Sequence, residues 1–441
     1  MGVVNQITDL DNSSKTLPYN RFHLLQTLIS FPDSFRRERA PALHINHETH
    51  TSLINIMREV LFMKIKHITA ILISVLLLMI PTFSVSALSE SDIASPAAVL
   101  MDANSGKILF EKNAHEQRAC ASITKVMTLT LVMEAVDSGR IHLDDVVTAS
   151  AHAASMGGSD IWLEEGEQMS VDDMIKATAV ASANDAAVAL AEFVCGSEED
   201  FVAAMNDKAA ALGMTDTTFK NCNGLDEEGH ITSAYDVALM SRELIRHEKI
   251  YDYTSIWIDE LRGGETQIVN TNKLLKSYDG ITGLKTGTTG DAGSCISATA
   301  QRNGLSLIAV VLGADTGKGR FKDAAALLDY GFANFETREL RLQEELSPIT
   351  VEGGMQNSVT ISCDDSAYLT VPKGEGGGLK QTLEIPETIT APVAKGDVVG
   401  SLRFTLGDEE IASFDVTADE DVEEKDFGSI LKLLFQSMVK L

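Results

Sequence analysis

Residues 306–332, SLIAVVLGADTGKGRFKDAAALLDYGF, contain the sharpest change of pattern in the chain. The first part is an apolar run of strand length, and the part from Arg320 onward has the alanine- and leucine-rich pattern of a helix. Far upstream, residues 97–113 read AAVLMDANSGKILFEKN, two apolar runs around an Asn-Ser-Gly turn, which is typical of a β-hairpin. Strands at both ends of a region with helices between them predict an α+β domain whose sheet is covered by helices.

Three helical patterns lie between these strands. The last of them stops at Gly213, a residue type that commonly follows the final helical turn. We expect a helix over each segment: ITKVMTLTLVMEAVDSG (123–139), VDDMIKATAVASANDAAVALAEFV (171–194) and EEDFVAAMNDKAAALG (198–213).

The pattern changes again after about residue 340. Short β-branched alternations are separated by Gly, Asp and Pro turns, which is typical of a small β-sandwich or barrel without a cluster of catalytic side chains. We expect an all-β sandwich domain over residues 337–420. Its strand-like segments are SVTISC, AYLTVP, QTLEIPETIT, VVGSLRFTLG and IASFDVTA.

The chain ends FGSILKLLFQSMVKL after an acidic stretch. On a 3.6-residue helix the apolar side chains cover one broad face and the polar ones the other, so residues 426–441 are predicted to form an amphipathic helix. In an exported protein such a helix is expected to anchor the chain at a membrane surface. The alternative is a helix that packs on its own domain. The apolar face would hold Phe427, Ile430, Leu431, Leu434, Phe435, Met438 and Leu441.

Residues 63–87, MKIKHITAILISVLLLMIPTFSVSA, have the parts of a secretory signal peptide. Lys64 and Lys66 give a positive start, an apolar run follows, and Val-Ser-Ala at residues 85–87 is a small-residue cleavage site. Pro81 interrupts the run before it reaches the ~20 residues that a spanning helix needs. Residues 1–62 precede a signal that belongs at a chain start. We expect a mis-started extension there, the alternative being a cytoplasmic tail before a signal anchor.

Composition excludes several classes of function. The chain has 441 residues, 44% of them hydrophobic, which allows two or three domains and a sizeable core. Its formal net charge of −28 argues against a basic surface that binds the phosphate backbone of a nucleic acid, so no nucleic-acid partner is expected. The five cysteines are scattered without a C-x-x-C pair, and there is no H-E-x-x-H or Walker loop. We therefore expect no metal, no cofactor and no disulfide framework.

The stretch ACASITKVMT, Ala119 to Thr128, contains Ser122 and Lys125 at a spacing that places both on one helical face. Serine is a poor nucleophile until a base takes its proton, and lysine can be that base only if burial or a second cation lowers its pKa. The spacing alone is weak, because SMVK at the C-terminus shares it. The chemistry also needs a second cation and a route for the proton.

Two further motifs supply what this chemistry lacks. ASAND contains Ser182 and Asn184 on or just after an alanine-rich helix, and GLKTGTTG contains Lys285, Thr286 and Gly287 in a strand-like segment. The set S-x-x-K, S-x-N and K-T-G in this order is shared by penicillin-binding proteins and class A β-lactamases.

With these motifs, the chain resembles the serine-type D-alanyl-D-alanine carboxypeptidases, the low-molecular-mass penicillin-binding proteins of peptidase family S11. The resemblance also includes FKNCNGLDEEGHITSAYD, GKGRF at residues 317–321 and PVAKGDVVGSLRF. It implies a transpeptidase/β-lactamase-like catalytic domain over residues 88–336, followed by the β domain and the terminal helix. It also implies removal of the last D-alanine from peptidoglycan stem peptides, acylation by β-lactams, and a location at the outer face of the cytoplasmic membrane.

The resemblance assigns a role to each candidate residue. Ser122 would be the nucleophile and Lys125 its base, while Ser182 would relay a proton to the leaving D-alanine and Asn184 would orient Lys125. Lys285 would help keep Lys125 neutral, and the backbone N–H groups of Ser122 and Thr288 would form the oxyanion hole. The substrate-binding set is expected to be Lys285, Thr286, Gly287, Thr288 and Arg320, with a surface salt bridge as the alternative role of Arg320.

One departure and three rival functions accompany this hypothesis. Cys120 stands where the family often has proline, and we expect a small buried side chain rather than a reactive thiol. A class A β-lactamase would need an E-x-x-L-N loop that is not found between Ser182 and Lys285, and a non-catalytic wall-binding relative would have lost a motif residue. A Ser-His-Asp hydrolase has no G-x-S-x-G elbow to support it, and the histidines of the first domain are expected at the surface or as caps: His115, His142, His152, His230 and His247.

Overall fold

The computed structural model describes residues 57–69 and 88–439 of the chain, which divides into two compact units, residues 1–83 and 84–441. In the first unit residues 57–69 form a helix, on which Lys64 and Lys66 lie. The remainder of the predicted extension and signal peptide, including the apolar run and the cleavage site, lies outside the described residues. Within the two described ranges, every helix is too short or too polar to cross a bilayer.

A five-stranded antiparallel sheet in the order β2-β1-β9-β8-β7 forms the centre of the first domain of the second unit. The predicted hairpin is present as β1 and β2, and the apolar run that follows Ser306 lies in β9, so both predictions are confirmed. The third motif lies on β7, an edge strand. The bounds are β1 Ala97–Asp102, β2 Ile108–Lys112, β7 Ile281–Thr289, β8 Gly293–Arg302 and β9 Leu305–Ala314.

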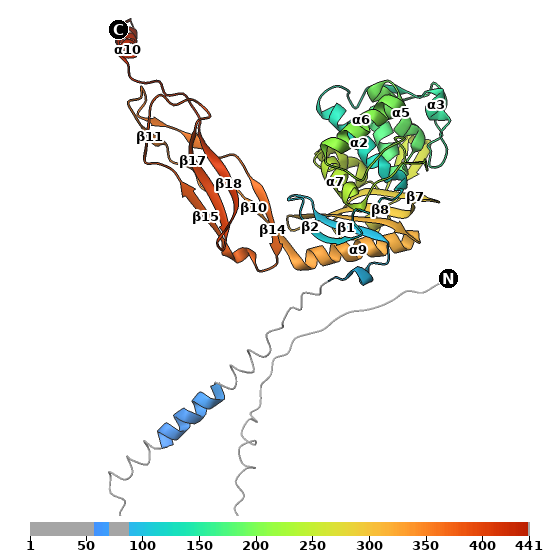
Figure 1. Cartoon of the computed structure of the whole chain (residues 1–441), viewed down its shortest axis with the longest axis horizontal. Coiled ribbons are helices and arrows are strands. Elements are labelled where there is room, and N and C mark those ends of the chain that lie inside the picture. Colours follow the sequence, from blue (N-terminus) through green and yellow to red (C-terminus); the bar gives the residue numbers. More distant parts are fainter. Residues whose placement is uncertain (1–56, 70–87, 440–441) are drawn as a thin grey trace, which may run out of the picture. The chain divides into compact units, whose positions relative to one another are not determined.

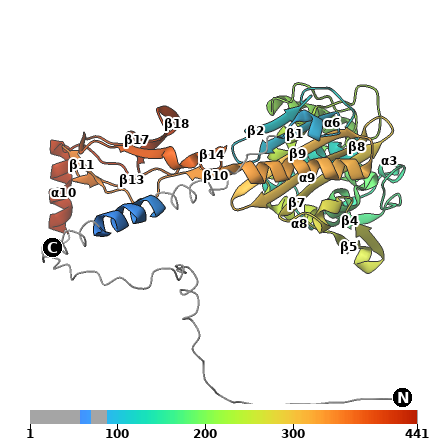
Figure 2. The ribbon, with the colours of Figure 1, turned by 90° about the horizontal axis from the view of Figure 1, so that it is seen from below.

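Helices cover both faces of this sheet (Figure 1). On β1, Val99 and Met101 point into the larger core beneath the helical layer, whereas Ala98 and Leu100 point into a second core beneath α9, Gly317–Asn334. Figure 2 shows α9 lying across the strands. Because both faces are buried, the central strands read as continuous apolar runs. The predicted α+β architecture is confirmed.

The opposite layer contains α2 Lys125–Asp137, α5 Asn184–Cys195, α6 Glu198–Ala211 and α7 Ala234–Leu244. Gly213, with a φ of 75°, follows the end of α6 as predicted. The shorter elements are η1 Glu90–Asp92, η2 Ala121–Thr124, β3 Val146–Thr148, α3 Ala151–Ala154, β4 Gln168–Ser170, α4 Val171–Lys176, η3 Ala177–Ala181, η4 Glu248–Ile250, α8 Tyr251–Thr254, β5 Ile258–Leu261, η5 Arg262–Gly264, β6 Thr266–Val269 and η6 Lys273–Lys276.

The remaining strands form the predicted all-β domain. A four-stranded sheet, β13-β18-β17-β15, and a three-stranded sheet, β12-β11-β16, enclose a core of β-branched and other aliphatic side chains, and β10 pairs with β14. The bounds are β10 Phe335–Leu340, β11 Ile349–Glu352, β12 Ser358–Val359, β13 Ile361–Ser362, β14 Ala367–Pro372, η7 Gly376–Gly378, β15 Leu379–Glu384, β16 Thr388–Thr390, β17 Val398–Leu406 and β18 Glu409–Ala418.

The predicted terminal helix is present as α10, Phe427–Val439. Its described apolar side chains are uncovered: Phe427 is 82% exposed, Phe435 61% and Met438 71%. The alternative of a helix packed on its own domain therefore finds no support in these side chains.

Candidate active site

Ser122 lies in a tight turn rather than in the body of a helix. The turn is the 3-10 segment η2, and α2 begins only at Lys125. Ala121 has a φ of 51°, a left-handed conformation that is unfavourable for alanine and turns the chain sharply before the serine. Lys125 Nζ lies 3.1 Å from Ser122 Oγ, so the contact expected from the S-x-x-K spacing is present.

Two glycines press against this turn. A Cβ atom at Gly224, whose φ is 86°, would lie 2.0 Å from the carbonyl oxygen of Ala121. A Cβ atom at Gly287 would lie 2.7 Å from the carbonyl oxygen of Cys120 and 2.9 Å from the Ser122 nitrogen. Strand β7 therefore runs directly against the turn, and the glycine of K-T-G is required because nothing larger fits between the two backbones.

Lys125 is fully buried, and only uncharged oxygens contact its side-chain nitrogen in the described structure. Besides Ser122 Oγ, Nζ lies 2.5 Å from Asn184 Oδ1 and 2.6 Å from the main-chain oxygen of Asn223. Burial lowers the pKa of Lys125 to about 7, because the charged form has lost its water; the charges of Asp160 and Asp185, which make no direct contact with it, act to raise the pKa but do not offset this loss. A substantial fraction of the amine is therefore unprotonated near neutral pH.

The helix expected over residues 171–194 is broken at the second motif. α4 passes into the π-helical turn η3, Ser182 adopts a left-handed φ of 64°, and α5 begins at Asn184. The prediction of one helix was wrong because tertiary contacts outweigh the helix propensity of this alanine-rich segment.

Those contacts connect the break to both lysines. Lys285 Nζ donates to Ser182 Oγ at 2.8 Å, and Asn184 Oδ1 accepts from Lys125. Asn184 Nδ2 donates to the carbonyl oxygen of Gly157 at 2.6 Å, which fixes the orientation of the amide. A regular helix through residues 182 and 184 would turn these two side chains onto different faces.

The third motif brings a second lysine to the site. Lys285 is buried, and its pKa is well below its usual range because of burial first and the nearby charges of Lys125 and Arg320 second. Besides Ser182, it donates to the main-chain oxygen of Thr286 at 3.1 Å. Thr286 Oγ1 in turn donates to Thr271 Oγ1 at 2.6 Å. The S-x-x-K and S-x-N motifs thus meet at Lys125, and Ser182 joins them to K-T-G.

Arg320 approaches the same strand from α9. Its Nη1 donates to the main-chain oxygen of Gly287 and to Thr288 Oγ1, both at 2.8 Å. The side chain is buried, forms no ion pair within the described residues, and leaves Nε without a partner there. Burial lowers its pKa. The alternative role as a surface salt bridge is therefore wrong, and Arg320 is a buried cation without a compensating anion in the described structure.

Sequence reasoning missed several groups of this site. Asn223 acts through its carbonyl oxygen, a group that every residue has, so only the position of the loop reveals it. Gly224 carries a signal, since an Asn-Gly pair often marks a positive φ. Thr271, which accepts from Thr286, lies outside the motifs. The first two belong to FKNCNGLDEEGHITSAYD, which the resemblance included without assigning a role.

Neither Cys120 nor His230 makes a hydrogen bond to Ser122 or Lys125. Cys120 is fully buried, and burial raises the pKa of its thiol to about 12, so the expectation of a buried, unreactive side chain is confirmed. The expectation of surface or capping histidines fails at His230, which is 4% exposed. His230 contacts Thr124 and the main chain of Lys220, not Ser122.

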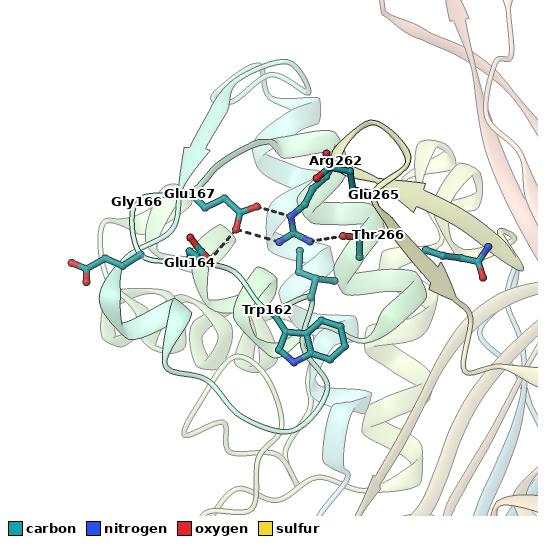
Figure 3. A pocket seen from close by; sticks show the side chains of 10 residues that line it. Trp162, Glu164, Gly166, Glu167, Arg262, Glu265 and Thr266 are labelled. Carbon is teal, nitrogen blue, oxygen red and sulfur yellow. Dashed lines mark hydrogen bonds and ion pairs between the residues drawn. The ribbon is translucent and has the colours of Figure 1, made fainter.

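A separate hollow of about 810 Å³ lies on the same domain (Figure 3). Glu167 on its wall pairs with Arg262, with 2.6 Å between Oε1 and Nε, and Trp162 is 79% exposed. The loop that carries Trp162 also provides the Gly157 carbonyl that holds Asn184. None of the predicted site residues lines this hollow; its polar lining includes Glu164, Glu165, Glu265, Thr266 and Gln267.

Comparison with known proteins agrees with this geometry. Residues 84–316 match the family model of D-alanyl-D-alanine carboxypeptidases, peptidase S11, and residues 335–424 match that of the penicillin-binding protein 5 C-terminal domain. The D-alanyl-D-alanine carboxypeptidase DacF of Bacillus subtilis is 42% identical over 378 residues, which cover 83% of this chain and 96% of that relative.

Two solved structures extend the comparison. Penicillin-binding protein 5 from Haemophilus influenzae has 35% identity and a TM-score of 0.64, with 77% of this chain and 100% of that one covered. Penicillin-binding protein D2 from Listeria monocytogenes, in its ampicillin-bound form, has 35% identity and a TM-score of 0.50, with 54% and 97% covered. The predicted family and enzyme class are confirmed: the chain belongs to the D-alanyl-D-alanine carboxypeptidase family, peptidase S11, and is a serine hydrolase of peptidoglycan metabolism.

Proposed function

We propose that the enzyme removes the terminal D-alanine of stem pentapeptides through an acyl-enzyme on Ser122, with Lys125 as the base. The observation that carries this proposal is the arrangement of hydrogen bonds around Lys125 Nζ. A neutral amine has two N–H groups and one lone pair. Asn184 Oδ1 and the Asn223 carbonyl accept the two N–H groups, which leaves the lone pair for the Ser122 hydroxyl.

Ser122 Oγ then attacks the carbonyl of the penultimate D-alanine while its proton passes to Lys125. The C–N bond breaks, and the leaving D-alanine takes a proton from Ser182, which recovers one from Lys285. The contact between Lys285 and Ser182 at 2.8 Å supports this relay. In a second step water attacks the ester, its proton passes through Ser182 to Lys285, and Lys125 returns its proton to Ser122 as the acid leaves.

Recognition of the terminal carboxylate is the proposed role of the buried cations. Lys285 and Arg320 have no anionic partner in the described structure, so a carboxylate beside them gains charge-assisted hydrogen bonds. Thr286 and Thr288 add hydroxyl groups on the same strand. Thr288 Oγ1 already accepts from Arg320, which supports a shared pocket.

The oxyanion hole is assigned to the backbone N–H groups of Ser122 and Thr288. Gly287 brings β7 against the Ser122 nitrogen, and β7 lies at the edge of the sheet among the described strands, so alternate N–H groups of β7 have no partner strand there. Preorganised donors of this kind contribute on the order of several kcal/mol to acyl transfer.

Release of D-alanine from a peptide ending Lys-D-Ala-D-Ala tests this proposal. The full chain should release D-alanine and react with a fluorescent penicillin, whereas Ser122→Ala should do neither. Penicillin should leave the acylated enzyme slowly. Activity retained in Ser122→Ala would remove the nucleophile assignment, and rapid turnover of penicillin would favour the β-lactamase alternative.

We further propose that the enzyme is exported by residues 63–87 and held at the outer face of the cytoplasmic membrane by α10. The uncovered Phe427, Phe435 and Met438 support an interfacial position for this helix. Deletion of residues 427–441 should abolish flotation with liposomes and leave D-alanine release unchanged. N-terminal sequencing of the secreted enzyme should find Leu88 first; a start within residues 1–62 would contradict the signal peptide.

A further inference from the structure

His230 is a buried histidine that the catalytic cycle does not use. The backbone that follows it is fixed, because Ile231 pairs with Thr218 and Thr232 pairs with Arg118. The ring packs edge-on against Phe219, with 5.8 Å between the ring centroids. The imidazole is therefore held rigidly within the domain.

The hydrogen bonds of the ring determine its tautomer. Nδ1 accepts from the main-chain N–H of Lys220 at 3.1 Å, so the proton lies on Nε2, which donates to Thr124 Oγ1 at 2.7 Å. Burial lowers the pKa of His230 to about 4, with Glu227 and Asp226 acting to raise it and Lys220 to lower it. The ring therefore stays neutral, in this tautomer, across the range in which Lys125 titrates.

Thr124 connects the ring to the nucleophile turn. It is the last residue of η2 and the N-cap of α2, yet its side chain makes no capping hydrogen bond. Its hydroxyl instead accepts from His230 and lies 3.4 Å from Cys120 Sγ, at the other end of the turn. The turn between them includes Ala121, whose left-handed backbone is unfavourable without such support.

We propose that His230 is a positioning residue for catalysis: through Thr124 it holds the strained turn in which Ser122 Oγ lies beside Lys125 Nζ. This inference rests on the proposed role of Ser122 as nucleophile. A shift of about 1 Å between nucleophile and base can cost roughly 100-fold in rate, so a hydrogen bond that fixes the turn has a direct kinetic effect.

The test is the kinetics of acylation of the full chain by a fluorescent penicillin, with the acylation rate constant and the preceding non-covalent dissociation constant measured separately. His230→Leu and Thr124→Val should each lower the acylation rate constant by roughly 10- to 100-fold and leave the dissociation constant unchanged. The double variant should be no slower than either single variant, because both remove the same bond.

Two variants separate positioning from a general loss of stability. His230→Gln carries an acceptor and a donor at nearly the separation of the ring nitrogens and should stay within about threefold of the wild type. His247→Leu removes a histidine that pairs with Asp137 elsewhere in the domain and should leave the rate constant unchanged. All rates are compared at a temperature at which circular dichroism shows each variant folded.

Several outcomes would overturn the proposal. An acylation rate constant equal to that of the wild type in Thr124→Val would overturn it. This result is decisive even if His230→Leu does not fold. Additive losses in the double variant would also overturn it, as would a loss in His230→Gln as large as that in His230→Leu. Ser122→Ala is measured in parallel: if it still reacts, the nucleophile assignment fails, whereas if it is inert and the His230 and Thr124 variants are normal, only the positioning role fails.

Discussion

Two lysines in the same helical layer have opposite surroundings. Lys208 on α6 reaches Glu134 on α2 and Glu243 on α7, with Nζ 2.5 Å and 2.7 Å from the carboxylate oxygens. Partial burial acts to lower its pKa, but the hydrogen bonds to the two carboxylates raise it above the usual range. Lys125 is buried more completely, bonds only to neutral oxygens within the described part of the chain, and has a pKa of about 7. The same side chain thus pairs with carboxylates in one place and, in the other, has the lowered pKa that the proposed base needs.

The largest test of this contrast is Lys125→Met. Loss of the base should lower acylation and D-alanine release by about 10²- to 10⁴-fold. The variant should also unfold at a higher temperature than the wild type at pH 7, because a buried amine that prefers to be charged when exposed to water is replaced by an apolar side chain. The measurements are acylation rate and thermal unfolding. A less stable variant would mean that the Lys125 hydrogen bonds stabilise the fold more than burial of the amine destabilises it.

Replacement of Arg320 by leucine removes a cation without touching the nucleophile. KM for a peptide ending in D-Ala-D-Ala should rise by roughly 10- to 100-fold, since charge-assisted hydrogen bonds to the terminal carboxylate are lost. A matched peptide with a C-terminal amide should be a poor substrate for both enzymes and change little between them. If the two peptides lose activity equally, Arg320 positions β7 rather than the carboxylate.

The pH profile measures the state of Lys125 directly. Because only the neutral amine can accept the proton of Ser122, the acylation rate constant should rise about tenfold per pH unit below pH 7 and level off above it. The contribution of Lys125 to stability has the same sign: its folded pKa lies below its unfolded value, so stability increases as pH rises from about 7 towards 10.5. A rate constant that is flat through pH 7 would show that Lys125 is not the titrating base.

Lys208→Met should have the smallest effect, and on stability alone. Without Lys208, Glu134 and Glu243 lose their ion pairs, which should lower the free energy of unfolding by about 1 kcal/mol, as for other partly exposed ion pairs. The acylation rate constant should not change. Denaturant unfolding and penicillin acylation on the same preparation check both. A change in acylation would mean that the α2–α6–α7 contact reaches the cleft and that the two lysines are not independent.

The motifs were readable from the sequence because each chemical role there depends on a side chain. Spacing and order in the sequence connect the motif residues, and the structure brings them into contact: Ser122, Lys125, Ser182, Asn184 and Lys285. The helix-covered sheet was equally predictable, and the central strands, which are apolar almost throughout, are buried on both faces.

What the sequence did not reveal depends on the backbone. The left-handed residues Ala121 and Ser182 adopt conformations that their own preferences oppose, so only contacts formed in the folded chain account for them. The Asn223 carbonyl has no side-chain signature. His230 resembles any other histidine until its ring is found buried against Thr124.

The two glycines beside the nucleophile turn limit how such an enzyme can escape inhibition. With Ser122 as the proposed nucleophile, substrate and β-lactam compete for one serine, so a useful resistance change must admit the first and exclude the second. Any side chain at residue 224 or 287 would displace the backbone of that serine and weaken both reactions together. Resistance therefore has to arise at residues that contact only one of the two molecules. Selection of resistant enzymes from random variants should yield no substitution at residue 224 or 287.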